Sequence, residues 1–105
     1  MELVSYEQFN ELTEAYGSQG SIYLDFETAS EAHIRHIFAL LHLPLEAGMN
    51  REALVSLFGL NDAVDIYVPT HRTYEFTCGE KWVYSVFCTV EVEQGLGLVS
   101  VSISR

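Results

Sequence analysis

The period of the hydrophobic pattern changes once along this chain of 105 residues. Up to Gly59, apolar residues recur mostly at every third or fourth position, a spacing typical of helices with one buried face. From Val64 to Ile103, apolar and polar residues alternate, as they do in strands that turn one face to a core. We therefore predict one α+β domain over residues 1–105, in which hairpins build an antiparallel sheet and the helices pack on one face of it.

Three segments of the first half carry the signals that start and stop helices. The expected caps and stops are Ser5 and Gly17, then Thr28 and Pro44, and then Asn50 and Gly59. Ser5-x-x-Gln8 and Thr28-x-x-Glu31 both resemble capping boxes, in which side chains satisfy the first backbone N–H groups. Between the first two helices, residues 21–26 alternate after Gly20, which predicts a strand at an edge of the sheet.

Four more strands are expected in the second half, over residues 64–68, 74–78, 82–92 and 99–103. Matching the apolar faces pairs Val92 with Val99 and leaves Gly95-Leu96 as a two-residue type II′ turn. The same matching requires three residues between Cys78 and Trp82, and therefore a bulge. The predicted order of elements is α-β-α-α-β-β-β-β.

Charge is the second strong feature of the sequence. Fifteen acidic residues stand against five basic ones, a formal net charge of -10 at pH 7. The first basic residue is Arg35, and every charged residue before it is a carboxylate. Phosphate-backbone binding needs lysine and arginine to displace counterions, so the composition excludes a nucleic-acid partner. Complementary charge steers association, so we expect a basic protein partner instead.

The predicted contact set for this partner joins carboxylates of the first half to two aromatic residues. It comprises Glu7, Glu11, Glu14, Asp25, Glu27, Tyr67 and Phe87. The two aromatics have the opposite strand parity to the apolar residues around them, so they would lie on an open sheet face. Aromatic side chains with a polar tip are enriched at interfaces. The alternatives are that the carboxylates only solvate a helix and that the aromatics pack partly in the core.

Neither a catalytic centre nor a cofactor or metal site is expected. His33 and His36 have a helical spacing, but zinc needs more ligands than this pair supplies. Cys78 and Cys88 alternate with apolar residues in strands flanked by acids, whereas reactive thiols need electropositive surroundings. A hairpin turn after Cys78 separates the two sulfurs beyond bridging distance, so we expect two buried thiols and a reducing compartment.

The amino-terminal segment has neither the basic region nor the unbroken apolar stretch of a signal peptide. The sequence also lacks an apolar window of the roughly 18 residues that would span a bilayer. We therefore expect a soluble, cytoplasmic protein without a membrane partner, unless a leader precedes the sequence given.

A resemblance to a known superfamily rests on the segment Gly48–Gly59, which reads GMNREALVSLFG. It resembles the G-M-T-x-E-x-V-x-x-x-L-G segment of the superfamily of outer-membrane assembly lipoproteins and β-lactamase-inhibitor proteins. With the strands after it, the resemblance covers residues 43–103. It implies a short helix followed by antiparallel strands, in a non-catalytic module that grips another protein. No residue is given a binding role by this resemblance.

The charge and size also resemble those of bacterial immunity proteins. We therefore predict a non-catalytic, acidic immunity or inhibitor protein that neutralises a basic, nucleic-acid-degrading toxin. The alternatives are an envelope-associated inhibitor or assembly factor, as the superfamily implies, and a small-ligand-binding protein that uses a crevice between sheet and helices.

Overall fold

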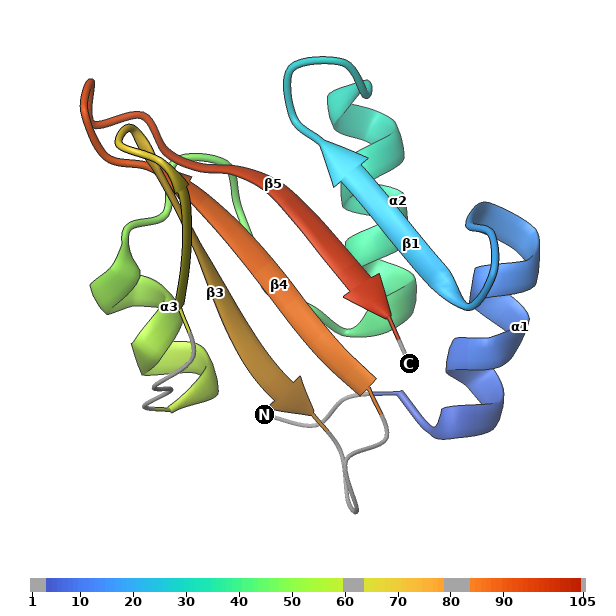
Figure 1. Ribbon diagram of the computed structural model, residues 1–105. Coiled ribbons are helices and arrows are strands. Elements are labelled where there is room, and N and C mark those ends of the chain that lie inside the picture. The colour runs from blue at the N-terminus through green and yellow to red at the C-terminus, as the bar shows by residue number, and fades with distance from the viewer. Residues whose placement is uncertain (1–3, 60–63, 79–83, 105) are drawn as a thin grey trace.

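The computed structural model describes residues 4–59, 64–78 and 84–104 (Figure 1). Within them, five strands form one antiparallel sheet in the order β1-β5-β4-β3-β2, accompanied by three helices. The elements are α1 (Tyr6–Tyr16), β1 (Ser21–Asp25), α2 (Glu31–Leu41), α3 (Arg51–Phe58), β2 (Val64–Val68), β3 (His71–Cys78), β4 (Tyr84–Glu91) and β5 (Gly97–Ser104). The predicted α+β class, element order and antiparallel sheet are confirmed.

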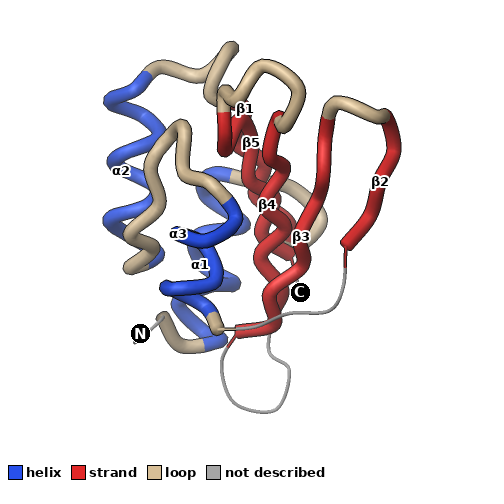
Figure 2. Tube along the Cα trace, turned by 90° about the vertical axis from the view of Figure 1, so that its left-hand side faces the viewer, coloured by secondary structure: helices blue, strands red, loops and turns tan. Residues whose placement is uncertain are grey.

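The core fills the space between the helices and the sheet. In Figure 2 the three helices lie to one side of the strands. Alternate sheet residues are buried, among them Ile22, Leu24, Val86, Cys88, Val101 and Ile103. From the helices, Phe9, Ile37 and Leu54 are also buried, and the rings of Phe58 and Phe76 stack at 4.7 Å. Each such apolar side chain stabilises the fold by roughly 1.5–3 kcal/mol.

The first and third helices begin and end where the sequence predicts. Ser5 Oγ accepts the N–H of Gln8 at 3.3 Å, and the Gln8 side chain accepts the N–H of Ser5 in return. Asn50 Oδ1 accepts the N–H of Ala53 at 2.9 Å. Gly17 caps α1 in an extended conformation, and glycine is required there because a Cβ would collide with the carbonyl oxygen of Ser21.

The second helix begins later than predicted. Ser30, and not Thr28, is its N-cap, and Ser30 Oγ accepts the N–H of His33 at 3.2 Å. The N–H of Thr28 donates instead to the carbonyl oxygen of Asp25, in a turn that leaves β1. The helix also ends before Pro44, since His42 adopts a left-handed conformation with φ 58° and the N–H of Leu43 bonds back into the last turn.

The β4–β5 hairpin also differs from the prediction. Glu91 pairs with Gly97, so the loop spans residues 92–96, and Val92 is exposed instead of paired with Val99. The register shifts by one residue between Thr89 and Val90, as in a β-bulge. The predicted bulge between Cys78 and Trp82 lies outside the described residues.

Contacts between residues that are far apart in the sequence set this register. The N–H of Leu98 donates to the carbonyl oxygen of Met49 at 2.8 Å, and the N–H of Gly48 donates to that of Leu98 at 3.0 Å. Gly97 has φ 75°, and a Cβ there would collide with the carbonyl group of Gly48. The segment before α3 therefore fixes where β5 begins.

Strand β1 lies at an edge of the sheet, as predicted, and pairs with β5 from Ser21–Ser104 to Asp25–Ser100. Turns close both of its ends. Ser18 and Ser21 exchange backbone hydrogen bonds at one end, and the N–H groups of Thr28 and Ala29 donate to the Asp25 carbonyl oxygen at the other. These turns shorten the free edge that another strand could join.

Candidate functional site

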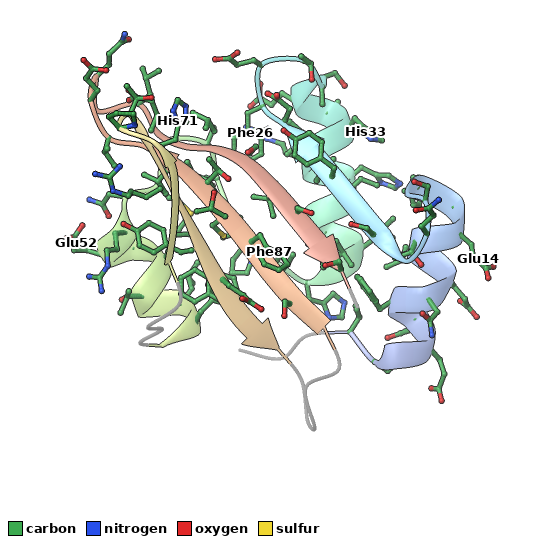
Figure 3. All side chains as sticks on the ribbon, viewed as in Figure 1. Glu14, Phe26, His33, Glu52, His71 and Phe87 are labelled. Atoms are coloured by element: carbon green, nitrogen blue, oxygen red, sulfur yellow. The ribbon has the colours of Figure 1, made fainter. Side chains whose placement is uncertain are left out.

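The first candidate surface is the acidic side of α1. Glu7, Glu11 and Glu14 are all exposed, while Phe9 and Thr13 on the other side of the helix are buried. Figure 3 shows Glu14 on the outer side of α1, pointing away from the sheet. These carboxylates form a solvated stripe on the helical layer of the molecule.

The second candidate surface is the face of the sheet that turns away from the helices in Figure 2. Its residues alternate with the buried ones and are mostly small and hydroxylated. We call it the Ser/Thr face; it comprises Tyr23, Thr73, Glu75, Ser85, Phe87, Thr89, Ser100, Ser102 and Ser104. Ser85 Oγ donates to Glu75 Oε1 at 3.1 Å, and the hydroxyls of Thr73 and Thr89 lie 2.9 Å apart.

Two aromatic residues lie in one row across the middle of this face. Ser102 of β5 pairs with Tyr23 on one side and with Phe87 on the other. Phe87 pairs in turn with Glu75 of β3. Tyr23 is 63% exposed, and Phe87, labelled near the centre of the sheet in Figure 3, is partly exposed. Aromatic side chains on the outward face of a sheet are enriched at surfaces that bind another protein.

A hollow of about 400 Å³ adjoins this row, and we call it the notch. It is lined by Tyr23, Asp25, Glu27, His71, Thr73, Thr89, Val99 and Ser100. Asp25, Ser100, Thr89 and Thr73 form the next row, as the pairings of β1, β5, β4 and β3 show. Asp25 Oδ1 already accepts the N–H of Glu27 at 2.8 Å.

Beyond the notch, Glu91 organises the β4–β5 loop. It is 6% exposed, and its carboxylate accepts the N–H groups of Glu93, Gln94 and Leu96. The N–H of Gln94, and after it that of Leu96, hold the pKa of the Glu91 carboxyl below its ordinary value. His71, its partner across the ladder, lowers this pKa further. The three backbone bonds give Glu91 a structural role in the loop.

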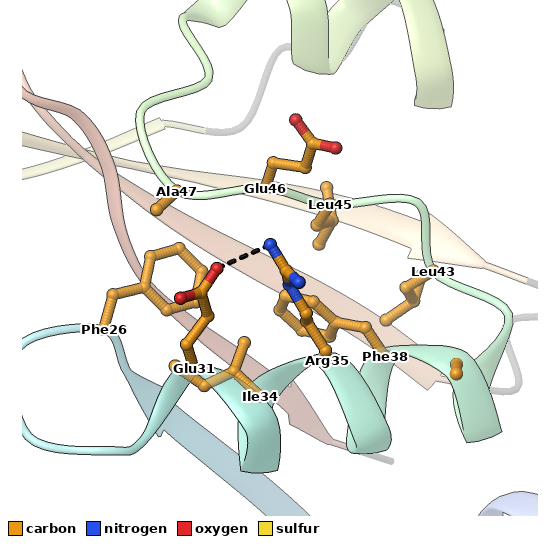
Figure 4. Close-up of a pocket in the computed structure, with 10 residues that line it drawn as sticks. Phe26, Glu31, Ile34, Arg35, Phe38, Leu43, Leu45, Glu46 and Ala47 are labelled. Atoms are coloured by element: carbon orange, nitrogen blue, oxygen red, sulfur yellow. Dashed lines mark ion pairs between the residues drawn. The ribbon is translucent and has the colours of Figure 1, made fainter.

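The third candidate surface is a groove of about 760 Å³ between α2 and the segment after it (Figure 4). Its apolar lining is formed by Phe26, Ile34, Phe38, Leu43 and Leu45. Arg35 and Glu31 form an ion pair of 2.5 Å at the rim, and Glu46 lies in the opposite wall. Both side chains of the pair are more than three-quarters exposed, so the pair is worth little to stability.

The structure divides the predicted contact set between two surfaces. Asp25 and Glu27 line the notch, and Phe87 lies in the adjoining row. The three glutamates of α1 lie in the helical layer instead. The backbone of Tyr67 belongs to β2, but its side chain lies outside the described residues. The prediction missed Tyr23, although its alternation with the buried Ile22 and Leu24 marks it as outward-facing.

The histidines and cysteines that could carry chemistry are described only in part. The described residues contain no group of three or more histidine, cysteine or acidic side chains that could hold a metal ion. His33 and His36 are exposed, and the Tyr16 hydroxyl lies 3.3 Å from His36 Nε2. Cys88 is a buried core residue, whereas the side chain of Cys78 is not described. None of the helices in the described ranges has the length and apolar character needed to cross a bilayer.

Comparison with known proteins returns nothing: no family model, curated protein or solved structure matches the chain.

Proposed function

We propose that this chain is a non-catalytic, acidic binding module that recognises a basic protein through the Ser/Thr face. The observation that carries the proposal is the row formed by Tyr23, Ser102 and Phe87 on the outward side of the sheet. The proposal is supported by Figure 2, in which the described helices lie to the other side of the strands.

The composition of the face suits protein recognition. Tyrosine gives a large contact area at a low cost in conformational entropy, and serine gives adaptable hydrogen bonds. Here Tyr23 and Phe87 supply the aromatic area, and the serines and threonines around them supply hydroxyl groups. We therefore propose that this face determines the dissociation rate of the complex, because buried aromatic anchors dominate the stability of interfaces.

The charge of the molecule supports a basic partner. The three described arginines each have a local contact: Arg35 with Glu31, Arg51 at 5.9 Å from the ring of Tyr74, and Arg72 with the carbonyl oxygens of Pro69 and His71. The carboxylates of α1 are exposed and extend the negative field beyond the sheet. In this proposal they steer the approach of the partner, whereas the Ser/Thr face makes the contact.

The partner we propose is a basic, nucleic-acid-degrading toxin, which makes this chain an immunity protein of the cytoplasm. An enzyme that binds nucleic acid has a cationic surface for phosphates. A small acidic module can cover that surface and so exclude the substrate. The alternative is an envelope-associated inhibitor or assembly factor, favoured by the capped helix α3 and the antiparallel strands that follow it.

The test is a comparative capture from the native host. Wild-type chain, a Tyr23→Ser/Phe87→Ser variant and a Leu96→Ser variant are immobilised at equal density, and retained proteins are quantified by mass spectrometry. Leu96 is a matched control because it is 52% exposed and lies in the β4–β5 loop, outside the Ser/Thr face.

We expect a basic protein that binds the wild type and the Leu96 variant but not the double variant, and whose nuclease activity the wild type inhibits. Equal retention by all three chains would reject the Ser/Thr face. A retained partner that is acidic, or whose activity is unchanged, would reject the toxin-inhibitor function. Near-ultraviolet circular dichroism of each variant checks that the fold is intact.

A further inference from the structure

Resting on the proposed function, we infer that the notch is an arginine site: it receives the guanidinium group of one arginine side chain of the partner. The notch lies next to the aromatic row, so a partner seated on Tyr23 and Phe87 would cover it. The inference depends on the acceptors that the notch presents, on its volume and on the ring at its side.

Acceptors of three strands converge in the notch. Asp25 of β1, Ser100 of β5 and Thr89 of β4 are direct neighbours in one row of the ladder. Side chains that face each other in this way lie about 5 Å apart. Asp25 Oδ1 is engaged by the backbone of Glu27, which fixes the carboxylate and leaves Oδ2 for a ligand. The exposed Glu27 adds a second carboxylate at the rim.

Ser100 supplies a hydroxyl next to Asp25. The residue lines the notch and is 9% exposed. Its neighbours Thr73 and Thr89 bond to each other. Among the described side chains, Asn10 Oδ1 is the atom that is buried without a partner, so the hydroxyl of Ser100 is open to solvent in the notch. A guanidinium group that enters the notch can take the place of water at Ser100 while it pairs with Asp25.

The β-bulge opposite Thr89 shapes this end of the sheet. The register shift places Val99 as an extra residue between the pairs that join β4 to β5, and Val99 also lines the notch. Bulges bend a strand and re-aim its side chains, and they are frequent next to functional sites. Here the bulge lies beside Ser100 and Asp25.

The chemistry favours arginine over lysine. A guanidinium group is planar and has five N–H donors in a fork, whereas an ammonium group is a compact point charge. The carboxylate of Asp25 and the hydroxyl of Ser100 offer acceptors side by side, which suits the fork. Tyr23, at the side of the notch, offers a ring on which a guanidinium group can stack.

The experiment needs no partner protein. Nα-acetyl-arginine amide is titrated into the ¹⁵N-labelled full chain, with the neutral isostere Nα-acetyl-citrulline amide and with Nα-acetyl-lysine amide as comparisons. We expect saturable shifts of the backbone amides of Asp25, Thr89 and Ser100. The citrulline compound should bind at least about tenfold more weakly, because the charge-assisted hydrogen bond to Asp25 is lost.

Three variants complete the test. Asp25→Asn retains an oxygen that can accept the Glu27 N–H, and Ser100→Ala removes only a hydroxyl; each should weaken arginine binding. Glu11→Gln on α1 removes the same charge as Asp25→Asn and should leave arginine binding unchanged. The arginine site would be overturned by shifts that do not saturate, or by shifts of equal size for the arginine and lysine compounds. It would also be overturned if Glu11→Gln weakened arginine binding as much as Asp25→Asn. Such a failure would not reject the proposed role of the aromatic row, because the capture experiment on Tyr23 and Phe87 tests that role separately.

Discussion

The carboxylate of Glu91 accepts the backbone N–H of Leu96 at 3.0 Å, and this bond closes the loop between β4 and β5. The N–H of Gln94 donates to the same carboxylate at 2.9 Å. A charged acceptor makes stronger hydrogen bonds than a neutral one. The loop conformation, and with it the start of β5 at Gly97, is therefore tied to the ionised state of Glu91.

Because the loop depends on the ionised Glu91, we expect the free energy of unfolding to depend on pH. The folded pKa of Glu91 lies below its ordinary value, so the ionised carboxylate stabilises the fold at neutral pH. That contribution is fully present above the ordinary value of 4.5 and is lost as the pH falls through the lowered folded pKa. We expect Glu91→Gln to be less stable than wild type at pH 7, with a difference that narrows as the pH falls into this range.

Urea denaturation of the two proteins between pH 7 and the acid limit of folding measures this difference. Glu93→Gln is the control, since Glu93 is exposed and contributes only its backbone N–H to the cluster. A difference between wild type and Glu91→Gln that stays constant at all pH values would contradict the role of the charge.

Gly97 and Gly95 form a matched pair for a second prediction. Both have a positive φ, 75° for Gly97 and 74° for Gly95. A Cβ at Gly97 would collide with the carbonyl group of Gly48, whereas nothing lies within 4 Å of a Cβ at Gly95. Gly95→Ala should cost about 1 kcal/mol through the left-handed backbone alone, and Gly97→Ala clearly more.

Thermal and urea unfolding of the two alanine variants test this pair. If they lose the same stability, then the contact between Gly48 and Gly97 does not fix the start of β5.

The two glycines also illustrate how much of the fold can be predicted from the sequence. Signals that act within a few residues were sufficient at Ser5 and at Asn50, where a cap side chain bonds to a backbone N–H three residues later. The β4–β5 register could not be predicted in this way. It depends on the approach of Gly48 to Gly97 and on the buried carboxylate of Glu91, and neither appears in the alternation of apolar residues.

The start of α2 gives a third prediction, because a local signal failed there. Asp25 accepts the N–H groups of Thr28 and Ala29 through its carbonyl oxygen, so the chain turns before the helix and Ser30 becomes the cap. Ser30→Ala should cost about 1 kcal/mol of stability. Thr28→Ala, at an exposed position of the turn, should change it by less than about 0.5 kcal/mol. Urea denaturation of both variants checks the assignment, and the reverse order would restore Thr28 as the cap.

The candidate site could be predicted only in part for a related reason. Parity alone identified Phe87 as outward-facing, and it also identifies Tyr23. The row from Asp25 through Ser100 to Thr89 requires the strand order, in which the first strand in the chain joins the last. Ser100 shares the parity of Ser102 and Ser104, so its outward direction follows from the alternation. The place of Val99 at the notch depends on the one-residue shift, since uninterrupted alternation would put Val99 on the inward face.

The last prediction rests on the proposed function, in which α1 steers the partner and the Ser/Thr face makes the contact. Replacing Glu7, Glu11 and Glu14 with glutamine should slow association with the basic partner and flatten its dependence on salt, while dissociation is unchanged. Tyr23→Ser should have the converse effect, with faster dissociation and an unchanged salt slope. Stopped-flow or surface-based kinetics at several salt concentrations separate the two rates.

A second triple variant shows whether the position of the charge matters. Glu46, Glu52 and Glu93 are also exposed, and their replacement with glutamine removes the same charge from other parts of the surface. Association should slow less in this control than in the α1 variant, because the field of exposed charges decays over about 10 Å at moderate salt. Equal effects of the two triple variants would mean that net charge alone steers the partner, and α1 would then have no place in recognition.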